Sequence, residues 1–366
     1  QAPAGWVRSA RMNKQLNDVL LTDIVAPQGR YKANAPASPL LAGNGLVGVE
    51  IELEEFEGDA DRTRPLWTIH EDGSLQNGME FVLHPPRNGE QLIAGIDNFF
   101  GCKFRYTGGE RTSVHIHVDM TDNVKVGQFR SLFALTFLLE GAIYRIADEH
   151  RKWAGYSSPI IDMSPQRMNR LLAGNTAAQF GAGVTGQIHQ DKYYGFNSVS
   201  LKKHGTLEFR YFPCTDDKKV MLQWINLVLE LKAVALQFND PDELLKAFTD
   251  DAAVVKWIKK NLPKSADALL QYADRVDLLD RKRLILAVLH DKNAAQYRQV
   301  EPQISKSLKR LAVKRGWAHE DNGADEPQAP VAPVRVEEIY EADGQINMAA
   351  YQQLVQNIQQ RNRQRR

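Results

Sequence analysis

The sequence predicts an α+β protein in which an antiparallel β-sheet is backed by long helices and followed by a C-terminal helical extension. Short segments in which apolar and polar residues alternate indicate strands. Two longer segments, 125–150 and 216–238, place apolar residues three and four positions apart, which is typical of helices. The predicted order is strands, helix, strand, helix and then more helices. That order favours an antiparallel sheet over the regular alternation that builds a parallel one.

Five segments of the body have the pattern of strands. Residues 48–56 (GVEIELEEF) alternate apolar and acidic side chains, which predicts one apolar and one acidic face. Two shorter strands are predicted at 67–69 and 79–83, on either side of a turn. Residues 113–120 (SVHIHVDM) and 205–213 (GTLEFRYFP) repeat the alternation with histidine, aspartate, glutamate and arginine on the polar side. The polar faces of these strands are therefore candidates for a site.

The chain of 366 residues has the length of one large domain or two. Its composition divides it into five segments: an N-terminal arm at 1–41 with a short helix at 12–24, a core at 42–239, a helical extension at 240–319, an acidic Pro/Ala linker at 320–344 and a Gln/Arg-rich tail at 345–366. Apolar residues in the tail recur at spacings of three and four, which predicts a short amphipathic helix that docks on a partner or on another subunit. A solvated tail is the alternative.

Composition excludes several classes of protein. Hydrophobic residues make up 43% and charged residues 25%, as in ordinary globular proteins, and a net charge of +1 gives no field that attracts nucleic acid. No apolar run approaches the roughly 18–20 residues of a membrane-spanning helix. The cysteines, Cys102 and Cys214, form neither a disulfide framework nor a zinc pattern. We therefore expect a cytoplasmic protein with no membrane span and no specific nucleic-acid partner.

Two motifs suggest functions that their context does not favour. Gly43, Gly45 and Gly48 spell GxGxxG, but a dinucleotide site needs a strand before this motif and a helix after it, and here a strand follows. Protein-kinase and Walker A signatures are missing from the sequence. His115-x-His117-x-Asp119 resembles half of a metallo-hydrolase motif, although Met120 follows it and the segment alternates like a strand. A metallo-hydrolase that takes further ligands from His189 and His204 stays an alternative.

Side chains two residues apart on a strand share a face. This rule selects three pairs: Glu50 with Glu52, His115 with His117, and Glu208 with Arg210. Glu80 lies in a fourth strand. Each alone is more often a solvated or structural feature. If the strands are neighbours, however, two carboxylates about 4 Å apart repel by about 4 kcal/mol at an effective dielectric constant of about 20. Such a cluster requires cations, and carboxylates with histidine suit Mg²⁺ or Mn²⁺ better than zinc. A fixed arginine beside them suits a transferring phosphate.

Four segments occur in the order seen in the amidoligase family: GVEIELE at 48–54, WTIHEDGSLQNGMEFVL at 67–83, TSVHIHVDM at 112–120 and GTLEFRYFPCTD at 205–216. The sequence therefore resembles this family over about 48–238. The family belongs to the carboxylate–amine ligase superfamily, has the glutamine-synthetase fold and is frequent in phages and bacterial gene clusters. The resemblance implies a curved antiparallel sheet whose concave face holds two or three divalent cations between ATP and substrate.

The resemblance also implies roles for individual residues. The implied metal ligands are Glu50 and Glu208, with His115 completing a metal shell and Glu52 and Glu80 facing a second cation. His117 would face a nucleotide phosphate, and Arg210 would clamp the γ-phosphoryl group. Asp72 would place the amine or accept its proton. Arg111 and Asn197 would contact substrate or nucleotide.

The expected function is an ATP-dependent carboxylate–amine ligase that forms an amide through an acyl phosphate. Its partners would be amine and carboxylate substrates, peptides or peptidoglycan among them, with oligomer or assembly contacts through the arm and the tail. The alternative is a structural or binding subunit of a virion or other assembly on a ligase-like fold. The expected location is the cytoplasm, that of the host if a phage encodes the protein, or the virion.

Overall fold

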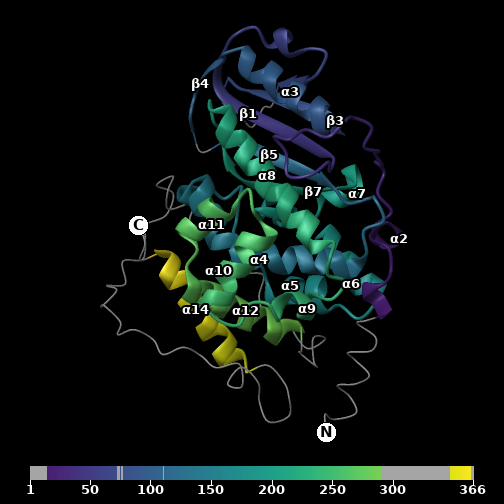
Figure 1. Ribbon diagram of the computed structural model, residues 1–366, viewed down its shortest axis with the longest axis vertical. Coiled ribbons are helices and arrows are strands. Elements are labelled where there is room, and N and C mark those ends of the chain that lie inside the picture. The colour runs from purple at the N-terminus through teal and green to yellow at the C-terminus, as the bar shows by residue number, and fades with distance from the viewer. Residues whose placement is uncertain (1–14, 72–74, 76, 110, 290–346, 364–366) are drawn as a thin grey trace.

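The computed structural model describes residues 15–71, 75, 77–109, 111–289 and 347–363 (Figure 1). The strands of the described chain are β1 (Val47–Glu57), β2 (Thr68–Glu71), β3 (Met79–Arg87), β4 (Arg105–Thr107), β5 (Ser113–Asp119), β6 (Phe196–Asn197) and β7 (Thr206–Pro213). The helices are α2 (Leu21–Val25), α3 (Gly89–Gly101), α4 (Val126–Ala147), α5 (Pro165–Ala173), α6 (Ala177–Thr185), α7 (Ser200–His204), α8 (Lys218–Ala235), α9 (Pro241–Leu245), α10 (Asp251–Asn261), α11 (Ala266–Tyr272), α12 (Arg275–Leu289) and α14 (Met348–Arg363). Short 3₁₀ helices span Ala60–Thr63, Glu149–Trp153, Ile160–Asp162 and His189–Tyr193.

The seven described strands form one open, antiparallel sheet, which confirms the predicted α+β class. Their order is β2-β3-β1-β5-β7-β6, and β4 pairs with the far end of β1. The central strands β1, β5 and β7 are therefore neighbours, although 91 positions of sequence separate His117 of β5 from Glu208, the residue opposite it on β7. This order brings the polar residues of all three strands onto adjacent positions.

The apolar side of the alternation forms the core. Val49 and Ile51 of β1 are fully buried, and Phe81 of β3 lies opposite Ile51. Phe81 packs edge-on against Phe99 of α3, and Phe212 of β7 stacks on Trp224 of α8. Helices α3, α8 and α4 contact β3, β5 and β7, respectively. Because helices cover the apolar face, the acidic and imidazole side chains lie on the opposite face of the sheet.

The N-terminal segment is more integrated than its description as an arm suggests. Leu16, Leu21 and Leu41 belong to the hydrophobic core, and Arg130 of α4 donates to Asn17 Oδ1 at 2.7 Å. The helix predicted at 12–24 appears in the described part as one helical turn at 15–17, followed by α2. Parts of residues 15–41 therefore pack against the body of the protein.

The C-terminal helices pack against α4 and against each other (Figure 1). The helical pieces predicted from 240 onward are present as α9 to α12, while the end of that extension and the acidic linker at 320–344 lie outside the described residues. The helix predicted in the tail is present as α14. It buries Tyr351, Leu354 and Ile358 and contacts α12 of the same chain.

One described helix, α4, is long and apolar enough to cross a membrane by length and composition alone. In this structure 89% of its apolar window is buried inside the protein, as in the core helix of a globular domain. The sequence predicted a helix here but no membrane span, because charged residues such as Arg130 and Glu140 interrupt its apolar run. Both of these charged side chains are buried.

Candidate functional site

The register of the sheet assembles a polar surface from four strands. Glu50 of β1 lies opposite His115 of β5, His117 of β5 lies opposite Glu208 of β7, and Glu208 lies opposite Asn197 of β6. Directly opposite residues of an antiparallel pair point to the same face, with their Cβ atoms about 4.5–5.5 Å apart. The alternation within each strand and the order of the strands therefore place two carboxylates and two imidazoles in one cluster.

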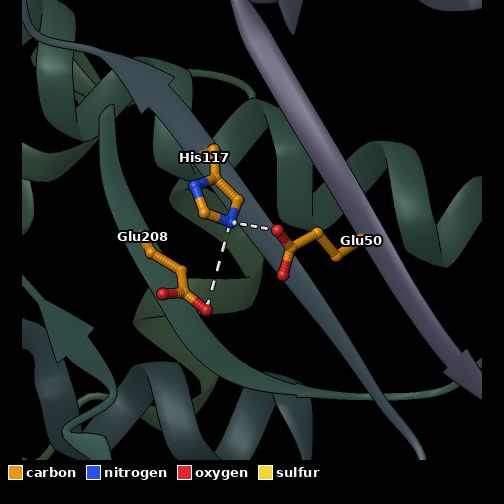
Figure 2. Close-up of side chains that lie close together, drawn as sticks. All are labelled: Glu50, His117 and Glu208. Carbon is orange, nitrogen blue, oxygen red and sulfur yellow. Dashed lines mark ion pairs between the residues drawn. The ribbon is translucent and has the colours of Figure 1, made fainter. Parts of the chain in front are cut away.

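The side chains of Glu50, His117 and Glu208 point toward one another (Figure 2). His117 Nε2 is 3.3 Å from Glu50 Oε1 and 4.0 Å from Glu208 Oε1. One nitrogen or oxygen atom from each residue lies within 4.8 Å of the others, a spacing that a single metal ion can bridge. Within the described residues this is the group of acidic and imidazole side chains with that spacing.

The ring of His117 is oriented by a residue of β7. Its Nδ1 lies 2.9 Å from Thr206 Oγ1, so the other ring nitrogen, Nε2, faces the carboxylates. Nε2 is buried and has no well-formed hydrogen bond within the described part of the chain. A histidine that binds a metal through one nitrogen usually has its second nitrogen held by a polar neighbour. This donor set therefore fits a divalent cation.

His115 lies beside the same two carboxylates. Its Nδ1 is 3.2 Å from Glu50 Oε2 and 3.1 Å from Glu208 Oε1, and its Nε2 is 3.0 Å from Ser113 Oγ. Ser113 Oγ also donates to Glu52. The family resemblance implied a metal shell for His115 and a phosphate contact for His117. The structure brings both imidazoles to Glu50 and Glu208, with His117 in the group that has metal-ligand spacing.

The charges of the cluster balance one another. Burial alone would raise the pKa of Glu50, but His117 and His115 hold that pKa well below its usual range. Burial likewise opposes ionisation of Glu208, yet Arg210 and the two imidazoles lower its pKa. The pKa of His117 is raised because the two carboxylates outweigh its burial. Both carboxylates are therefore ionised at neutral pH, which a cation ligand requires.

Arg210 is fixed at the edge of the cluster. Its NH1 group donates to Glu208 Oε1, and its Nε donates to the carbonyl oxygen of Tyr156 at 3.0 Å. The guanidinium also lies 5.8 Å from the centre of the Tyr193 ring. Burial would lower the pKa of Arg210, but Glu208, Glu52 and Glu50 raise it, so the side chain stays cationic. The site thus combines ionised carboxylates with a positioned positive charge.

The remaining predicted residues occupy different places. Glu80 lies opposite Glu52 on one side and His70 on the other, which forms a second polar row beside the first. Asn197 donates to Glu208 Oε2 and so orients that carboxylate. Arg111 lies 4.0 Å from Glu54 Oε1, near the far end of β1. Asp72 lies outside the described residues.

Two residues of the metallo-hydrolase alternative, Asp119 and His189, stay outside the cluster. Asp119 Oδ1 accepts from the backbone and the hydroxyl of Thr121, at 3.1 and 2.7 Å. His189 Nε2 lies 3.1 Å from Tyr193 Oη. Neither residue joins the group with metal-ligand spacing in the described chain.

A pocket of about 490 Å³ opens beside Glu50 and His117. Residues that line it and that the sequence reasoning missed are Tyr31, His84, Lys203 and Thr206. His204, considered only as a zinc or iron ligand, also lines it, with its ring centre 6.2 Å from that of His117. Burial, followed by the charge on His117, lowers the pKa of both His84 and His204. These two imidazoles are therefore neutral at neutral pH.

The alternation of β3 could have revealed His84, since it follows Glu80 at a spacing of four on the same strand. Thr206 could have been found in the same way, two positions before Glu208 on β7. Tyr31 lies in an irregular segment, and Lys203 lies in the short helix α7, so neither shows a periodic signal.

Comparison with known proteins supports the resemblance seen in the motifs. Residues 103–232 match the model of a family described as "putative amidoligase enzyme". This range contains His115, His117, Glu208 and Arg210, whereas Glu50 lies before it. No curated protein and no solved structure matches the chain. The match supports the resemblance to this family over residues 103–232, while the glutamine-synthetase-like fold stays a prediction.

Proposed function

We propose, on the premise of the amidoligase match over residues 103–232, that the protein is an ATP-dependent carboxylate–amine ligase. The observation that carries the proposal is the convergence of Glu50, His117 and Glu208 from three neighbouring strands. Arg210 stands beside this group as a fixed cation. A cluster of ionised carboxylates next to a positioned arginine suits chemistry on a metal-bound polyphosphate.

The residues of the site suit Mg²⁺ or Mn²⁺, because carboxylate oxygens with one imidazole are ligands that these ions accept. We propose that Glu50, His117 and Glu208 hold a first cation, with His115 beside it. Glu52 and Glu80 are candidates for a second. Bound cations would neutralise the phosphate charge that develops during transfer.

In the proposed reaction, a carboxylate oxygen of the substrate attacks the γ-phosphorus of ATP. The bond from that phosphorus to the bridging oxygen breaks, and ADP leaves. An amine then attacks the carbonyl carbon of the acyl phosphate, phosphate leaves with the bonding electrons, and a base takes the proton of the amine. Activation is needed because a carboxylate is itself a poor acceptor for an amine.

Arg210 would hold the phosphoryl group during transfer. Glu208 and the Tyr156 carbonyl fix its guanidinium before substrate arrives, so its charge needs no reorganisation during the reaction. The 490 Å³ pocket beside His117 would take the nucleoside of ATP. Its neutral imidazoles and the Tyr31 hydroxyl offer hydrogen bonds to an uncharged ring, and Lys203 supplies a positive charge.

The test is ADP formation from Mg²⁺-ATP in the presence of mixed amines and carboxylates. We expect turnover by the unmodified protein and a loss on the order of 100-fold or more in Arg210→Ala, comparable to removing a donor that stabilises a transition state. Arg64→Ala is the control, since Arg64 is exposed and forms an ion pair with Asp61, away from the cluster. Equal turnover in Arg210→Ala and the unmodified protein would contradict the proposal.

A further inference from the structure

A buried ion pair lies behind the sheet, on the side of the helices. Glu140 of α4 and Arg281 of α12 are 0% and 1% exposed, and Glu140 Oε2 accepts from Arg281 NH1 at 3.1 Å. Arg281 Nε donates to Asp277 Oδ2 at 2.8 Å. Buried charges are costly, so a pair kept at this depth calls for a reason beyond stability.

The second oxygen of Glu140 joins two separate segments. Glu140 Oε1 accepts from the backbone N–H of Ile160 at 2.7 Å and from Tyr211 Oη at 3.0 Å. Tyr211 directly follows Arg210 in β7, and its side chain points to the helix side of the sheet. One carboxylate thus fixes both the strand that carries Arg210 and the segment at 156–160.

The 156–160 segment in turn holds the guanidinium of Arg210. The carbonyl oxygen of Tyr156 accepts from Arg210 Nε at 3.0 Å. The next carbonyl, that of Ser157, accepts from Tyr144 Oη at 2.6 Å, and the Tyr144 ring packs edge-on against Tyr211 at 5.0 Å. Glu140 and its neighbours therefore support the backbone of Arg210 through Tyr211, and its guanidinium through the carbonyl oxygen of Tyr156.

The charge on Arg281 strengthens this arrangement. Burial raises the pKa of Glu140 to about 7 even with Arg281 beside it. Without Arg281 the carboxyl would be protonated at neutral pH, and a neutral carboxyl accepts weaker hydrogen bonds than a carboxylate. The hydrogen bonds to Tyr211 and Ile160 would weaken with it.

We propose that Glu140 and Arg281 are positioning residues for Arg210, acting through Tyr211 and the 156–160 segment. The inference rests on the proposed function, in which Arg210 holds the γ-phosphoryl group. It also gives the C-terminal helices a role, because Arg281 lies outside the range that matches the family, 103–232.

The test compares the affinities of ATP and ADP, measured by calorimetry with Mg²⁺ present. The ratio of the two affinities reports the contact with the γ-phosphate, and loss of stability alone leaves this ratio unchanged in the folded protein. Tyr211→Phe removes one hydroxyl and keeps the ring, so it is the principal variant. Tyr351→Phe, at a buried tyrosine of α14, is its matched control.

We expect Tyr211→Phe to lower the preference for ATP over ADP by about tenfold and to leave ADP affinity unchanged. The expected loss is smaller than the roughly hundredfold cost of misplacing a catalytic group by about 1 Å, because the variant removes only one of the contacts that position Arg210. Arg281→Met should have the same effect, and Arg281→Lys should restore part of the preference. Tyr351→Phe should match the unmodified protein.

An unchanged ATP preference in Tyr211→Phe, with that preference lost in Arg210→Ala, would overturn the positioning role and leave the proposed function intact. If the unmodified protein shows no preference for ATP over ADP, the proposed role of Arg210 is wrong and this inference fails with it. The same follows if Arg210→Ala keeps that preference. Because Tyr211→Phe keeps its ring in the core, the test stands even if Arg281→Met fails to fold.

Discussion

At the scale of single residues, the site depends on which nitrogen of His117 faces the carboxylates. Thr206 Oγ1 lies 2.9 Å from Nδ1, and Nε2 faces Glu50 and Glu208. The carboxylates stay ionised despite burial because imidazoles and Arg210 lower their pKa values. In the proposed cation site these contacts would hold the ligands in place, so each supporting residue should affect affinity for the metal.

We predict that Thr206→Val weakens Mn²⁺ binding by about 10- to 100-fold, the range for losing a group that orients a metal-binding histidine. The variant keeps the shape of the side chain and removes the hydroxyl that holds Nδ1. Calorimetric titration with Mn²⁺ measures the effect. Thr185→Val is the control, because the Thr185 hydroxyl donates to Gly181 O within α6. Unchanged Mn²⁺ affinity in Thr206→Val would show that the ring needs no such support.

At the scale of elements, strands that carry the site could be predicted from the sequence. Strands β1, β5 and β7 begin and end within one residue of their predicted bounds, because a strand with one buried face must alternate. Helix α3 was missed. It contains Gly89, Gly95 and Gly101, which disfavour helices, and tertiary contacts such as the Trp67 Nε1 bond to Gly95 O support it.

Only part of the site could be predicted from the sequence, because alternation gives information within a strand but not between strands. Alternation selects residues that share a face within one strand, so Glu50, His115 and Glu208 could be named from the sequence. It does not give the register between strands, which decides that both imidazoles meet the same carboxylates. Tyr31 comes from an irregular segment, where no period exists to place it beside the pocket.

Packing between α4 and α12 gives a prediction about pH. The pKa of Glu140 is raised to about 7 by burial, against an ordinary value of 4.5. The folded state therefore binds a proton more tightly than the unfolded state, and this group lowers the free energy of unfolding as pH rises from 4.5 to 7. Glu140→Gln cannot titrate, so the stability difference, unmodified protein minus variant, should be larger at pH 5 than at pH 7.5.

Urea unfolding of both proteins at several pH values measures this difference. The comparison cancels the titration of groups that the substitution leaves alone. A difference that is constant from pH 5 to 7.5 would mean that Glu140 is ionised throughout the range, with Arg281 fully compensating its burial.

At the scale of the whole molecule, the C-terminal helices belong to the same body as the sheet. Arg281 of α12 reaches Glu140 in the core, and α14 closes over α12 with its apolar face buried. Helix α12 thus contacts both α4, which carries Glu140, and the tail helix α14, and the three belong to one cluster of helices below the sheet (Figure 1). Loss of α14 should accordingly expose apolar surface of its own chain.

We predict that Leu354→Ala, at a fully buried position of α14, destabilises the packing of this helix by about 2–5 kcal/mol. The cost is the lost burial of the side chain and the cavity left behind. Gln352→Ala, at an exposed position of the same helix, is the matched control. Thermal unfolding compares the two, and equal stability of both variants would contradict the packing of α14 described here.

The central claim is that Glu50, His117 and Glu208 form one site for a divalent cation. Electron paramagnetic resonance of Mn²⁺ tests it most directly, because bound and free Mn²⁺ give different signals without any need for substrate. We predict that the unmodified protein binds Mn²⁺ at neutral pH, that Glu50→Gln and Glu208→Gln each lose this binding, and that Glu243→Gln, at an exposed glutamate of α9, keeps it. Equal Mn²⁺ binding by all four proteins would contradict the claim.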